Sequence, residues 1–317
     1  MAVFTKISKN QIKDFLNFYD IGQLEDYNEI LEGIENTNYK IICNKIPYIL
    51  TIFEKRVKED DIPFFMDLKL YLNNNNFYCP KPIKNKNGII INNIKNKKAV
   101  IISFIQGEKI EAPNVNECKE LGKIIGKLHN LTARFDKKRE NNLDIKEWKS
   151  LLQKCEHKNV KKFSLICTKV KDEISFIENS WPKNLPSGII HADLFKDNVF
   201  FMKERITGVI DFYFSCYHFY LYDIAIIVND WCFNNNGKVF NTDLFKSILE
   251  GYSLQRKLED SEFQFFNVIL RAAAVRILVT RLHDYIFHPN DAIVVKKDPL
   301  QYFEILKWHQ NNRIPNS

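Results

Sequence analysis

The sequence lacks paired cysteine motifs, long hydrophobic runs and a leader-like amino terminus. Its seven cysteines are odd in number and form no C-x-x-C pair, which argues against a disulfide framework and a zinc site and fits a reducing cytoplasm. The first residues, MAVFTKISKNQIKDF, contain no apolar segment of the kind that directs secretion. The longest apolar stretch, Ile224–Val228, is far too short to cross a bilayer. We therefore expect a soluble, cytoplasmic protein with no membrane partner.

A basic stripe is also missing. The net charge is +7, but the lysines are scattered or lie in an Asn/Lys-rich hairpin, with no aromatic residues interleaved. We therefore expect a solvated surface and no nucleic-acid partner. The hydrophobic content of 45% and the charged content of 27% are those of an ordinary globular protein. With 317 residues, the chain can form two lobes with a core each. A monomer and a homodimer remain open.

The stretch richest in chemistry runs from Gly188 to Phe212. It contains His191-x-Asp193-Leu194-x-x-x-Asn198 and, thirteen residues further on, Asp211. This spacing is the pattern of a kinase catalytic loop followed by a metal-binding Asp. Phosphoryl transfer from ATP needs a carboxylate near the attacking hydroxyl and oxygen ligands for Mg²⁺. We predict His191 and Asp193 as catalytic residues, and Asn198 and Asp211 as the Mg²⁺ ligands.

The local pattern predicts how these residues are positioned. Residues 188–190 form a short buried strand that leads into the loop, and residues 199–202 and 206–210 form a hairpin turned by residues 203–205. The hairpin would return Asp211 beside Asn198, so that two oxygen ligands face one ion. Asp223, in a helix over residues 220–233, is expected to be buried and bonded to the backbone of the loop.

The amino-terminal part predicts an antiparallel sheet for the nucleotide. Strands are expected over residues 39–43, 47–53 and 99–105, with a polar hairpin over residues 84–98 around Asn87-Gly88. A loop with a single glycine precedes them and would cover the ATP phosphates through its backbone. Its predicted cofactor-binding residues are Gly33, Asn36, Thr37 and Asn38.

A basic residue is absent where a kinase strand would pair with phosphate. Thr51 occupies that position, and Lys55 and Arg56 follow shortly after. We predict that Lys55 or Arg56 reaches the phosphates, or that another group replaces the contact. Gln106, where the sequence passes between lobes, would lie at the adenine. The predicted lobes are residues 1–106 and 107–317, with the boundary near Gly107.

The remaining pattern is mostly helical. Ser8-x-x-Gln11 is a capping box that begins a helix ending near Tyr19. His129 is expected to be a satisfied core or surface histidine. Further helices are predicted over residues 61–72, 116–131, 147–155, 163–178 and 261–286. The last one carries Arg271, Arg276 and Arg281, and steps of five residues turn each arginine away from the one before. The predicted fold class is α+β, with an antiparallel-sheet amino-terminal lobe and a mainly helical carboxy-terminal lobe.

With these residues in view, the chain resembles the aminoglycoside phosphotransferase-like kinase superfamily, which has a bilobal protein-kinase-like fold, and more narrowly its bacterial homoserine kinases. The matching segments span most of the chain in order: GIENTNY (33–39), ILTIFEKR (49–56), HADLFKDNVFF (191–201), VIDFYFSC (209–216), YDIAIIVNDWCF (222–233), RAAAVRILVTRLHD (271–284) and KDPLQYF (297–303). Ala192 stands where many superfamily members have glycine, and Thr51 is typical of this subfamily.

The resemblance implies Mg²⁺- and ATP-dependent transfer of the γ-phosphate to the side-chain hydroxyl of L-homoserine, in threonine biosynthesis. It implies that Asp193 orients the hydroxyl or takes its proton. An amino acid also needs an acid for its ammonium group and an arginine for its carboxylate. We predict Asp230, with Trp231 beside it, and one of the three arginines, with Arg276 preferred.

Composition and spacing alone support only a kinase of small-molecule hydroxyls. Choline, aminoglycosides or other amino-alcohols are alternative acceptors, and a pseudokinase that acts as a binding module is the alternative from another class. A protein kinase is disfavoured because Tyr213 follows Asp211-Phe212 where glycine is expected, and no A-P-E segment follows.

Overall fold

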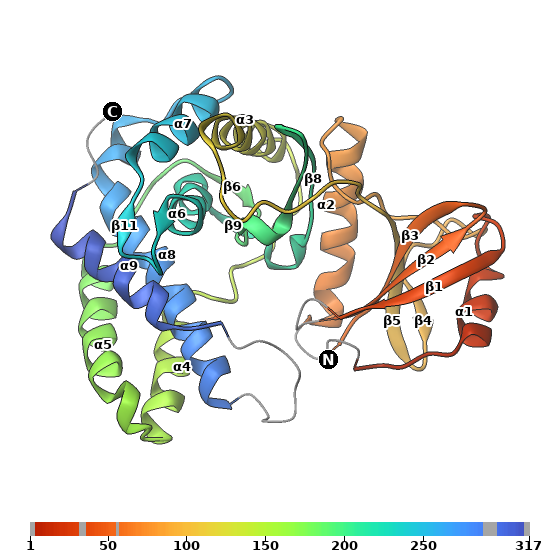
Figure 1. Ribbon diagram of the computed structural model, residues 1–317, viewed down its shortest axis with the longest axis horizontal. Helices are drawn as coiled ribbons and strands as arrows, with labels where there is room; N and C mark the ends of the chain where they lie inside the picture. The colour runs from red at the N-terminus through yellow and green to blue at the C-terminus, as the bar shows by residue number, and fades with distance from the viewer. Residues whose placement is uncertain (1–3, 32–35, 55–56, 288–296, 314–317) are drawn as a thin grey trace. The chain divides into compact units, whose positions relative to one another are not determined.

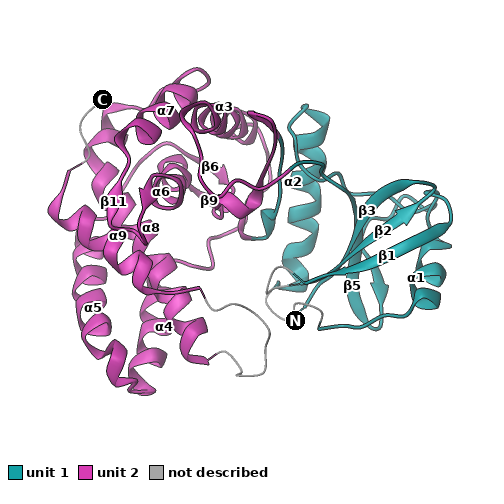
Figure 2. Ribbon diagram, in the orientation of Figure 1, with its two compact units in different colours: residues 1–107, 207–213, 291–294 teal, residues 108–206, 214–290, 295–317 magenta. Residues whose placement is uncertain are grey.

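The computed structural model describes residues 4–31, 36–54, 57–287 and 297–313 (Figure 1). These residues form two compact units (Figure 2). Unit 1 contains the chain up to Gly107 and the later segment Thr207–Tyr213, and unit 2 contains Glu108–Ile206 and the described chain from Phe214 onward. Unit 1 is built on an antiparallel sheet and unit 2 is mainly helical, which confirms the predicted α+β class.

The segment Thr207–Tyr213 joins unit 1 although the sequence prediction assigned it to the second lobe. Its contacts within unit 1 explain this: the N–H of Val209 donates to the carbonyl of Tyr78 over 2.9 Å. The ring of Phe212 also lies edge-on to Phe77, with ring centroids 6.4 Å apart. Backbone pairing and aromatic packing therefore attach this short segment to a unit from which it is remote in the sequence.

Unit 1 holds a five-stranded antiparallel sheet. The strand order is β1 (Leu24–Ile30), β2 (Thr37–Cys43), β3 (Ile46–Ile52), β5 (Lys97–Ser103) and β4 (Asn92–Ile94). Strands β2, β3 and β5 confirm the sequence prediction. The sequence did not predict β1, since LEDYNEI is polar and mostly exposed and carries no buried alternation. Two-residue turns join β2 to β3 and β4 to β5, each with both residues at positive φ.

The turn of the predicted 84–98 hairpin lies elsewhere than expected. The strands β4 and β5 pair across Lys95-Asn96, not around Asn87-Gly88. Asn87 and Gly88 instead form a local turn in which the side chain of Asn85 accepts the N–H groups of Asn87 and Ile89, both over 2.9 Å. A side chain that satisfies the backbone in this way stabilises a turn without paired strands.

Two helices complete unit 1. Helix α1 (Lys9–Leu16) has the predicted capping box of Ser8 and Gln11, and it ends at Leu16 rather than near Tyr19. Its apolar face lies against one side of the sheet (Figure 1), where Phe15 and Leu16 share a core with Tyr39 and Ile41. The second helix, α2 (Ile62–Asn74), confirms the prediction over 61–72 and buries Phe65, Leu68 and Leu72.

Unit 2 is organised around the buried helix α6 (Tyr220–Trp231) and the long, partly buried helix α8 (Asp260–Phe287). Every residue of α6 is buried. The other helices are α3 (Val115–Thr132), α4 (Ile145–His157), α5 (Ser164–Asn179), α7 (Thr242–Ser253) and α9 (Leu300–Asn311). The predicted helices correspond to α3, α4, α5, α6 and α8, whereas α7 and α9 were not predicted.

Short strands and turns position the central loop. The predicted entry strand and hairpin are confirmed as β6 (Ser187–Ile190), β7 (Val199–Met202) and β8 (Arg205–Val209). The sequence did not predict that β6 pairs with β9 (Cys216–Phe219). A small pair, β10 (Phe233–Asn234) and β11 (Val239–Phe240), follows α6. Single 3-10 turns occur at Glu59–Asp61, Lys161–Phe163, Lys196–Asn198 and Phe212–Phe214.

Helix α8 is long and apolar enough to cross a membrane by length and composition, and 61% of its most apolar 18-residue window is buried within the protein. The core helix of a globular protein meets the same criterion, so this single helix is weak evidence for a membrane span. Three arginines along α8 instead make polar contacts with other elements of unit 2.

Candidate active site

The central loop follows β6 and is held by a buried carboxylate. Asp223 of α6 accepts the N–H of His191 at Oδ2 over 2.8 Å and the N–H of Ala192 at Oδ1 over 2.7 Å, as predicted. Ala192 has a φ of 64°, a left-handed conformation that costs a non-glycine residue free energy. The two hydrogen bonds to Asp223 hold the backbone in this conformation and direct the chain into Asp193.

Asp193 and Asn198 lie together within the loop. The side-chain amide of Asn198 donates to the Asp193 carbonyl over 2.8 Å and to its carboxylate Oδ2 over 3.1 Å. Because the amide nitrogen makes both bonds, the amide oxygen of Asn198 is left for another partner, and Mg²⁺ prefers such oxygens. Arg276 of α8 lies close by, with Nη2 3.6 Å from Asp193 Oδ1. The loop therefore presents the carboxylate of Asp193 and the amide oxygen of Asn198, and α8 places the guanidinium of Arg276 beside them.

His191 is fully buried. Its Nδ1 accepts the N–H of Asp193 over 3.2 Å, and its carbonyl lies 3.5 Å from the hydroxyl of Ser215. These contacts support a role in positioning Asp193 rather than contact with a substrate. The predicted catalytic role of His191 stays a prediction.

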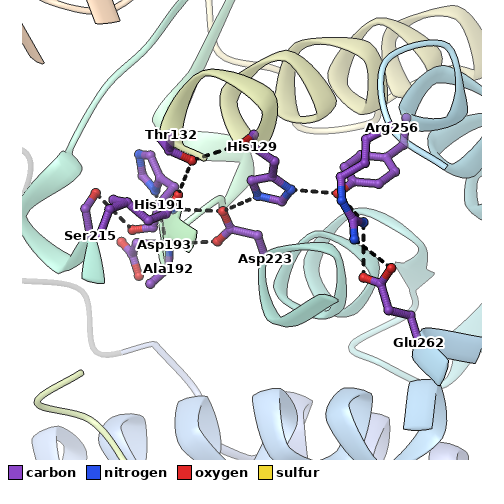
Figure 3. A network of polar contacts seen from close by, with 11 residues as sticks. His129, Thr132, His191, Ala192, Asp193, Ser215, Asp223, Arg256 and Glu262 are labelled. Carbon is purple, nitrogen blue, oxygen red and sulfur yellow. Dashed lines mark hydrogen bonds and ion pairs between the residues drawn. The ribbon is translucent and has the colours of Figure 1, made fainter. Parts of the chain in front are cut away.

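A chain of buried polar contacts extends from Asp223 across unit 2 (Figure 3). His129 of α3 contacts Asp223 through Nε2 over 3.2 Å and the hydroxyl of Tyr252 through Nδ1 over 2.7 Å. Arg256 donates to the Tyr252 hydroxyl over 3.0 Å and forms a two-pronged ion pair with Glu262. The prediction that His129 is a satisfied core histidine is confirmed.

The protonation states along this chain follow from burial. Desolvation lowers the pKa of His129 although Asp223 opposes it, so the ring is neutral. Burial acts to raise the pKa of Asp223, but the hydrogen bonds that its carboxylate accepts from His129 and from the N–H of His191 outweigh burial and lower the pKa. Because an ionised carboxylate only accepts, Nε2 of His129 carries the proton and Nδ1 accepts from Tyr252. The hydroxyl of Tyr252 is then free to accept from Arg256.

The predicted nucleotide residues lie in unit 1 on different sides of the sheet. The hydroxyl of Thr37 is buried; it accepts the N–H groups of Phe4 and Thr5 and donates to Glu54 over 2.8 Å. Its side chain therefore anchors the amino-terminal segment. Asn38 points to the opposite face, where its Oδ1 accepts the hydroxyl of Thr51 over 2.8 Å. This hydrogen bond shows how Thr51 is accommodated where a basic residue was expected.

Other predicted nucleotide residues are placed as follows. The side-chain oxygen of Asn36 accepts the N–H of Glu54 over 3.3 Å, and the carbonyl of Gln106 accepts the hydroxyl of Thr207 over 2.5 Å. Gly33, Lys55 and Arg56 lie outside the described residues. Lys69 of α2, to which the sequence assigned no role, is buried with its ammonium 4.2 Å from the ring centroid of Tyr213.

Asp211 follows β8 with a φ of 63°, the same unusual conformation as Ala192. It belongs to unit 1 whereas Asn198 belongs to unit 2, and the predicted pairing of the two around one ion stays a prediction. Among the described residues, no three His, Cys, Asp or Glu side chains gather to hold a metal. A Mg²⁺ site with one Asp and one Asn does not require such a cluster, because water and phosphate supply the other ligands.

The predicted acceptor residues surround the end of α6. Asp230 is buried, and its Oδ2 accepts the N–H of Lys196 over 2.8 Å. Burial raises the pKa of Asp230, although Lys196 and Arg281 act in the opposite direction. Trp231 is buried and donates its indole N–H to the carbonyl of Leu194 over 3.0 Å, so it supports the loop from below. The structure thus brings Asp193, Asp230, Trp231 and Arg276 together in unit 2.

Comparison with known proteins agrees with this geometry. Residues 26–252 match the family model APH, described as the phosphotransferase enzyme family. The chain belongs to this family. A homoserine kinase of Agrobacterium fabrum is 39% identical over 310 residues, which cover 98% of this chain and 96% of that protein. A homoserine kinase of Bartonella henselae is 40% identical over 98% of this chain and 97% of its own. The predicted family resemblance is confirmed.

Solved structures of phosphotransferases and related kinases share the fold. An amicoumacin kinase in complex with AMP-PNP, Ca²⁺ and Ami superposes with a TM-score of 0.71 at 17% identity, covering 96% of this chain and 94% of that chain. A choline kinase from Cryptosporidium parvum gives a TM-score of 0.69 at 17% identity, covering 96% and 95%. These similarities confirm the predicted protein-kinase-like fold within the phosphotransferase family.

Proposed function

We propose that this phosphotransferase transfers the γ-phosphate of ATP to the side-chain hydroxyl of L-homoserine, giving O-phospho-L-homoserine for threonine biosynthesis. The observation that carries the proposal is the similarity of 38–40% identity over nearly the whole chain to proteins named homoserine kinase. The catalytic loop supports it, because Asp193 and Asn198 have the contacts expected of a hydroxyl kinase. The protein would act in the cytoplasm, as a monomer or homodimer, on a small molecule.

In this proposal Asp193 accepts the hydrogen bond of the attacking hydroxyl and takes its proton. Asn198 fixes the Asp193 carboxylate through its amide nitrogen, and oxygens of Asn198 and Asp211 would hold Mg²⁺. When bound, Mg²⁺ would neutralise charge on the phosphate oxygens of ATP, which would supply the phosphoryl group. Asp223 keeps the loop backbone in place, and His191 supports the N–H of Asp193.

Unit 1 would bind the nucleotide. The residues Gly33–Asn38 would cover the phosphates through backbone N–H groups, with Asn36, Thr37 and Asn38 as contacts, and the backbone around Gln106 would bind adenine. Lys55 would reach the phosphates. The hydrogen bond between Asn38 and Thr51 supports this arrangement, since it fixes an amide side chain on the sheet face opposite α1.

On the acceptor side, Asp230 would bind the ammonium group of homoserine. Its buried carboxylate lies beside the loop and, among the described residues, accepts one hydrogen bond, from the N–H of Lys196. A substrate ammonium would compensate the desolvation that raises the pKa of Asp230. Trp231 would belong to the same site, and Arg276 is the arginine that the sequence favoured for the carboxylate.

The test is an ADP-release assay with Mg²⁺-ATP against L-homoserine, L-serine, choline and kanamycin. We expect turnover with homoserine and little with the others. For Asp193→Asn we expect turnover to fall by about 10²- to 10⁴-fold while ATP binding is retained. Turnover with choline or kanamycin alone would show that homoserine is the wrong acceptor, but would leave the kinase fold assignment unchanged. Silence across all four acceptors despite ATP binding would favour a binding module.

A further inference from the structure

Two of the three arginines of α8 already have strong partners. Arg271 donates through Nε and Nη2 to the carboxylate of Glu173 over 2.5 and 2.7 Å, and its guanidinium lies 3.8 Å from the ring centroid of Phe176. Arg276 is buried, donates to the carbonyl of Ala192 and lies beside Asp193. Arg271 is therefore paired, and Arg276 is held against the loop by the Ala192 carbonyl, although its buried Nε has no hydrogen-bond partner among the described residues.

Arg281 differs from them in exposure and in partners. It is partly exposed, and its Nη1 donates to a neutral group, the side-chain oxygen of Gln301, over 2.8 Å. Its guanidinium lies 4.4 Å from the ring centroid of Tyr302. Within the described residues, no carboxylate comes within 4 Å of this guanidinium. Arg281 thus presents a cation whose charge is not neutralised by a paired acid.

The hydroxyl of Tyr302, whose ring contacts Arg281, is a second polar group that the described residues leave without a partner. Tyr302 is fully buried, and its hydroxyl has no hydrogen-bond partner among the described residues. A buried donor without a partner costs free energy. Burial raises the pKa of Tyr302 well above its usual value, and the charges that act on it are Asp230, Arg281, Asp193 and Arg276. The ring of Tyr302 contacts the Arg281 guanidinium, so the hydroxyl belongs to the surroundings of this arginine.

We propose that Arg281, assisted by the hydroxyl of Tyr302, binds the carboxylate of the amino-acid acceptor. This inference rests on the proposed function, because it assumes an acceptor that carries an α-carboxylate. Asp230 and Arg281 then bind the opposite charges of a zwitterion, and Asp193 faces the hydroxyl. The contact with the Tyr302 ring and the hydrogen bond to Gln301 hold the guanidinium in place for a two-pronged contact with a carboxylate. Arg276 instead becomes a positioning residue for the loop.

The experiment compares L-homoserine with 3-aminopropan-1-ol, which has the same hydroxyl and amine but no carboxylate. For Arg281→Gln we expect the KM for homoserine to rise about 10- to 100-fold, with the KM for ATP within about twofold of the wild type. Turnover of 3-aminopropan-1-ol should be unchanged within about twofold, or undetectable in both proteins. Arg281→Lys should recover part of the loss, because it restores the charge without the fork.

Arg271→Gln is the matched control, because it removes a guanidinium from the same helix at a position paired to Glu173. It should lower stability and affect both acceptors equally. The inference is overturned if Arg281→Gln leaves the KM for homoserine unchanged, if it weakens both acceptors equally, or if the wild type uses 3-aminopropan-1-ol as well as homoserine. A wild type that turns over neither compound, but phosphorylates another acceptor, would instead refute the proposed function.

Discussion

His129 is the residue on which the buried polar chain depends, because its two ring nitrogens have opposite roles. Nε2 donates to Asp223 and Nδ1 accepts from Tyr252. A neutral imidazole can satisfy both partners in only one tautomer. The stacking of its ring on Tyr220, with centroids 4.6 Å apart, fixes its plane as well. The loop that carries Asp193 is therefore held, through Asp223, by a side chain of α3.

Removing the hydroxyl of Tyr252 tests this dependence. In Tyr252→Phe, Nδ1 of His129 and one N–H of Arg256 lose a partner, so we expect a loss of about 1–3 kcal/mol in the free energy of unfolding. We also expect turnover to fall about tenfold with the KM for ATP little changed. Urea unfolding and steady-state kinetics measure these effects, and ¹⁵N chemical shifts of the His129 ring report its tautomer.

Tyr222→Phe is the control for the loss of a buried hydroxyl. Tyr222 is buried on α6, and its hydroxyl has no hydrogen-bond partner in the described part of the chain. Its removal should be neutral or stabilising. If Tyr252→Phe kept full turnover and the wild-type ring shifts, the positioning role of the Tyr252 hydroxyl would be wrong.

Among the helices, the close approach of α3 and α7 brings His129 and Tyr252 together. A Cβ atom added at Gly251 would lie 1.9 Å from the carbonyl oxygen of Lys119, and one at Gly122 would lie 2.0 Å from that of Ile248. Both neighbours are helix backbone, which cannot move aside as a flexible side chain can. Glycine is required at these positions for contact between the two backbones, and not for a special φ.

Gly251→Ala should therefore destabilise the protein by about 1–3 kcal/mol and reduce turnover, because separation of α3 from α7 lengthens the bond between His129 and Tyr252. The sign of this stability change is informative. In a helix without such a contact, alanine is more stable than glycine by about 0.5–1 kcal/mol. Chemical denaturation measures the change. Ser253→Ala on the exposed side of α7 is the control and should lie within about 0.5 kcal/mol of the wild type. An increase in stability for Gly251→Ala would contradict the packing argument.

For the whole protein, three buried histidines set the response to mild acid. Burial lowers the pKa of His218 to about 4 and that of His309 to about 3, and it lowers the pKa of His129 as well. In the unfolded chain these rings titrate near 6.5. Below that value the unfolded state binds more protons than the folded state, so stability falls as the pH decreases.

We expect the free energy of unfolding to be constant near pH 7.5 and to decrease between about pH 6.5 and 5. The slope approaches about 1.4 kcal/mol per pH unit for each histidine. Burial raises the pKa of Asp230, so this carboxyl group changes the pH slope of the free energy of unfolding in the opposite direction. Its contribution corresponds to at most one proton. Guanidinium unfolding at several pH values measures the slope. His309→Gln retains a donor for Asn229 and should lower the pH slope of the free energy of unfolding by the amount that corresponds to about one proton. A free energy of unfolding that does not change with pH would show that the histidines are not buried in neutral form.

Local sequence patterns determined the parts of this protein that depend on near neighbours. The spacing of Asp193, Asn198 and Asp211, the strands around them and the capping box of Ser8 are short-range features, and steric alternation and helix periodicity encode them directly. Even the contact of Asp223 with the loop could be predicted, because a carboxylate in an apolar helix near a catalytic loop needs backbone donors. The family resemblance followed from the order of such segments.

Tertiary structure alone decided which distant groups meet. His129 contacts Asp223, which lies 94 positions further along the sequence, and Tyr252, which lies 123 positions further. Arg276 contacts the carbonyl of Ala192, 84 positions before it. No periodicity in the sequence distinguishes the arginine that is buried against the loop from the one that stays partly exposed beside Tyr302. That difference arises because packing of α8 against α9 and the central loop fixes the environment of each guanidinium, and packing is a property of the whole unit.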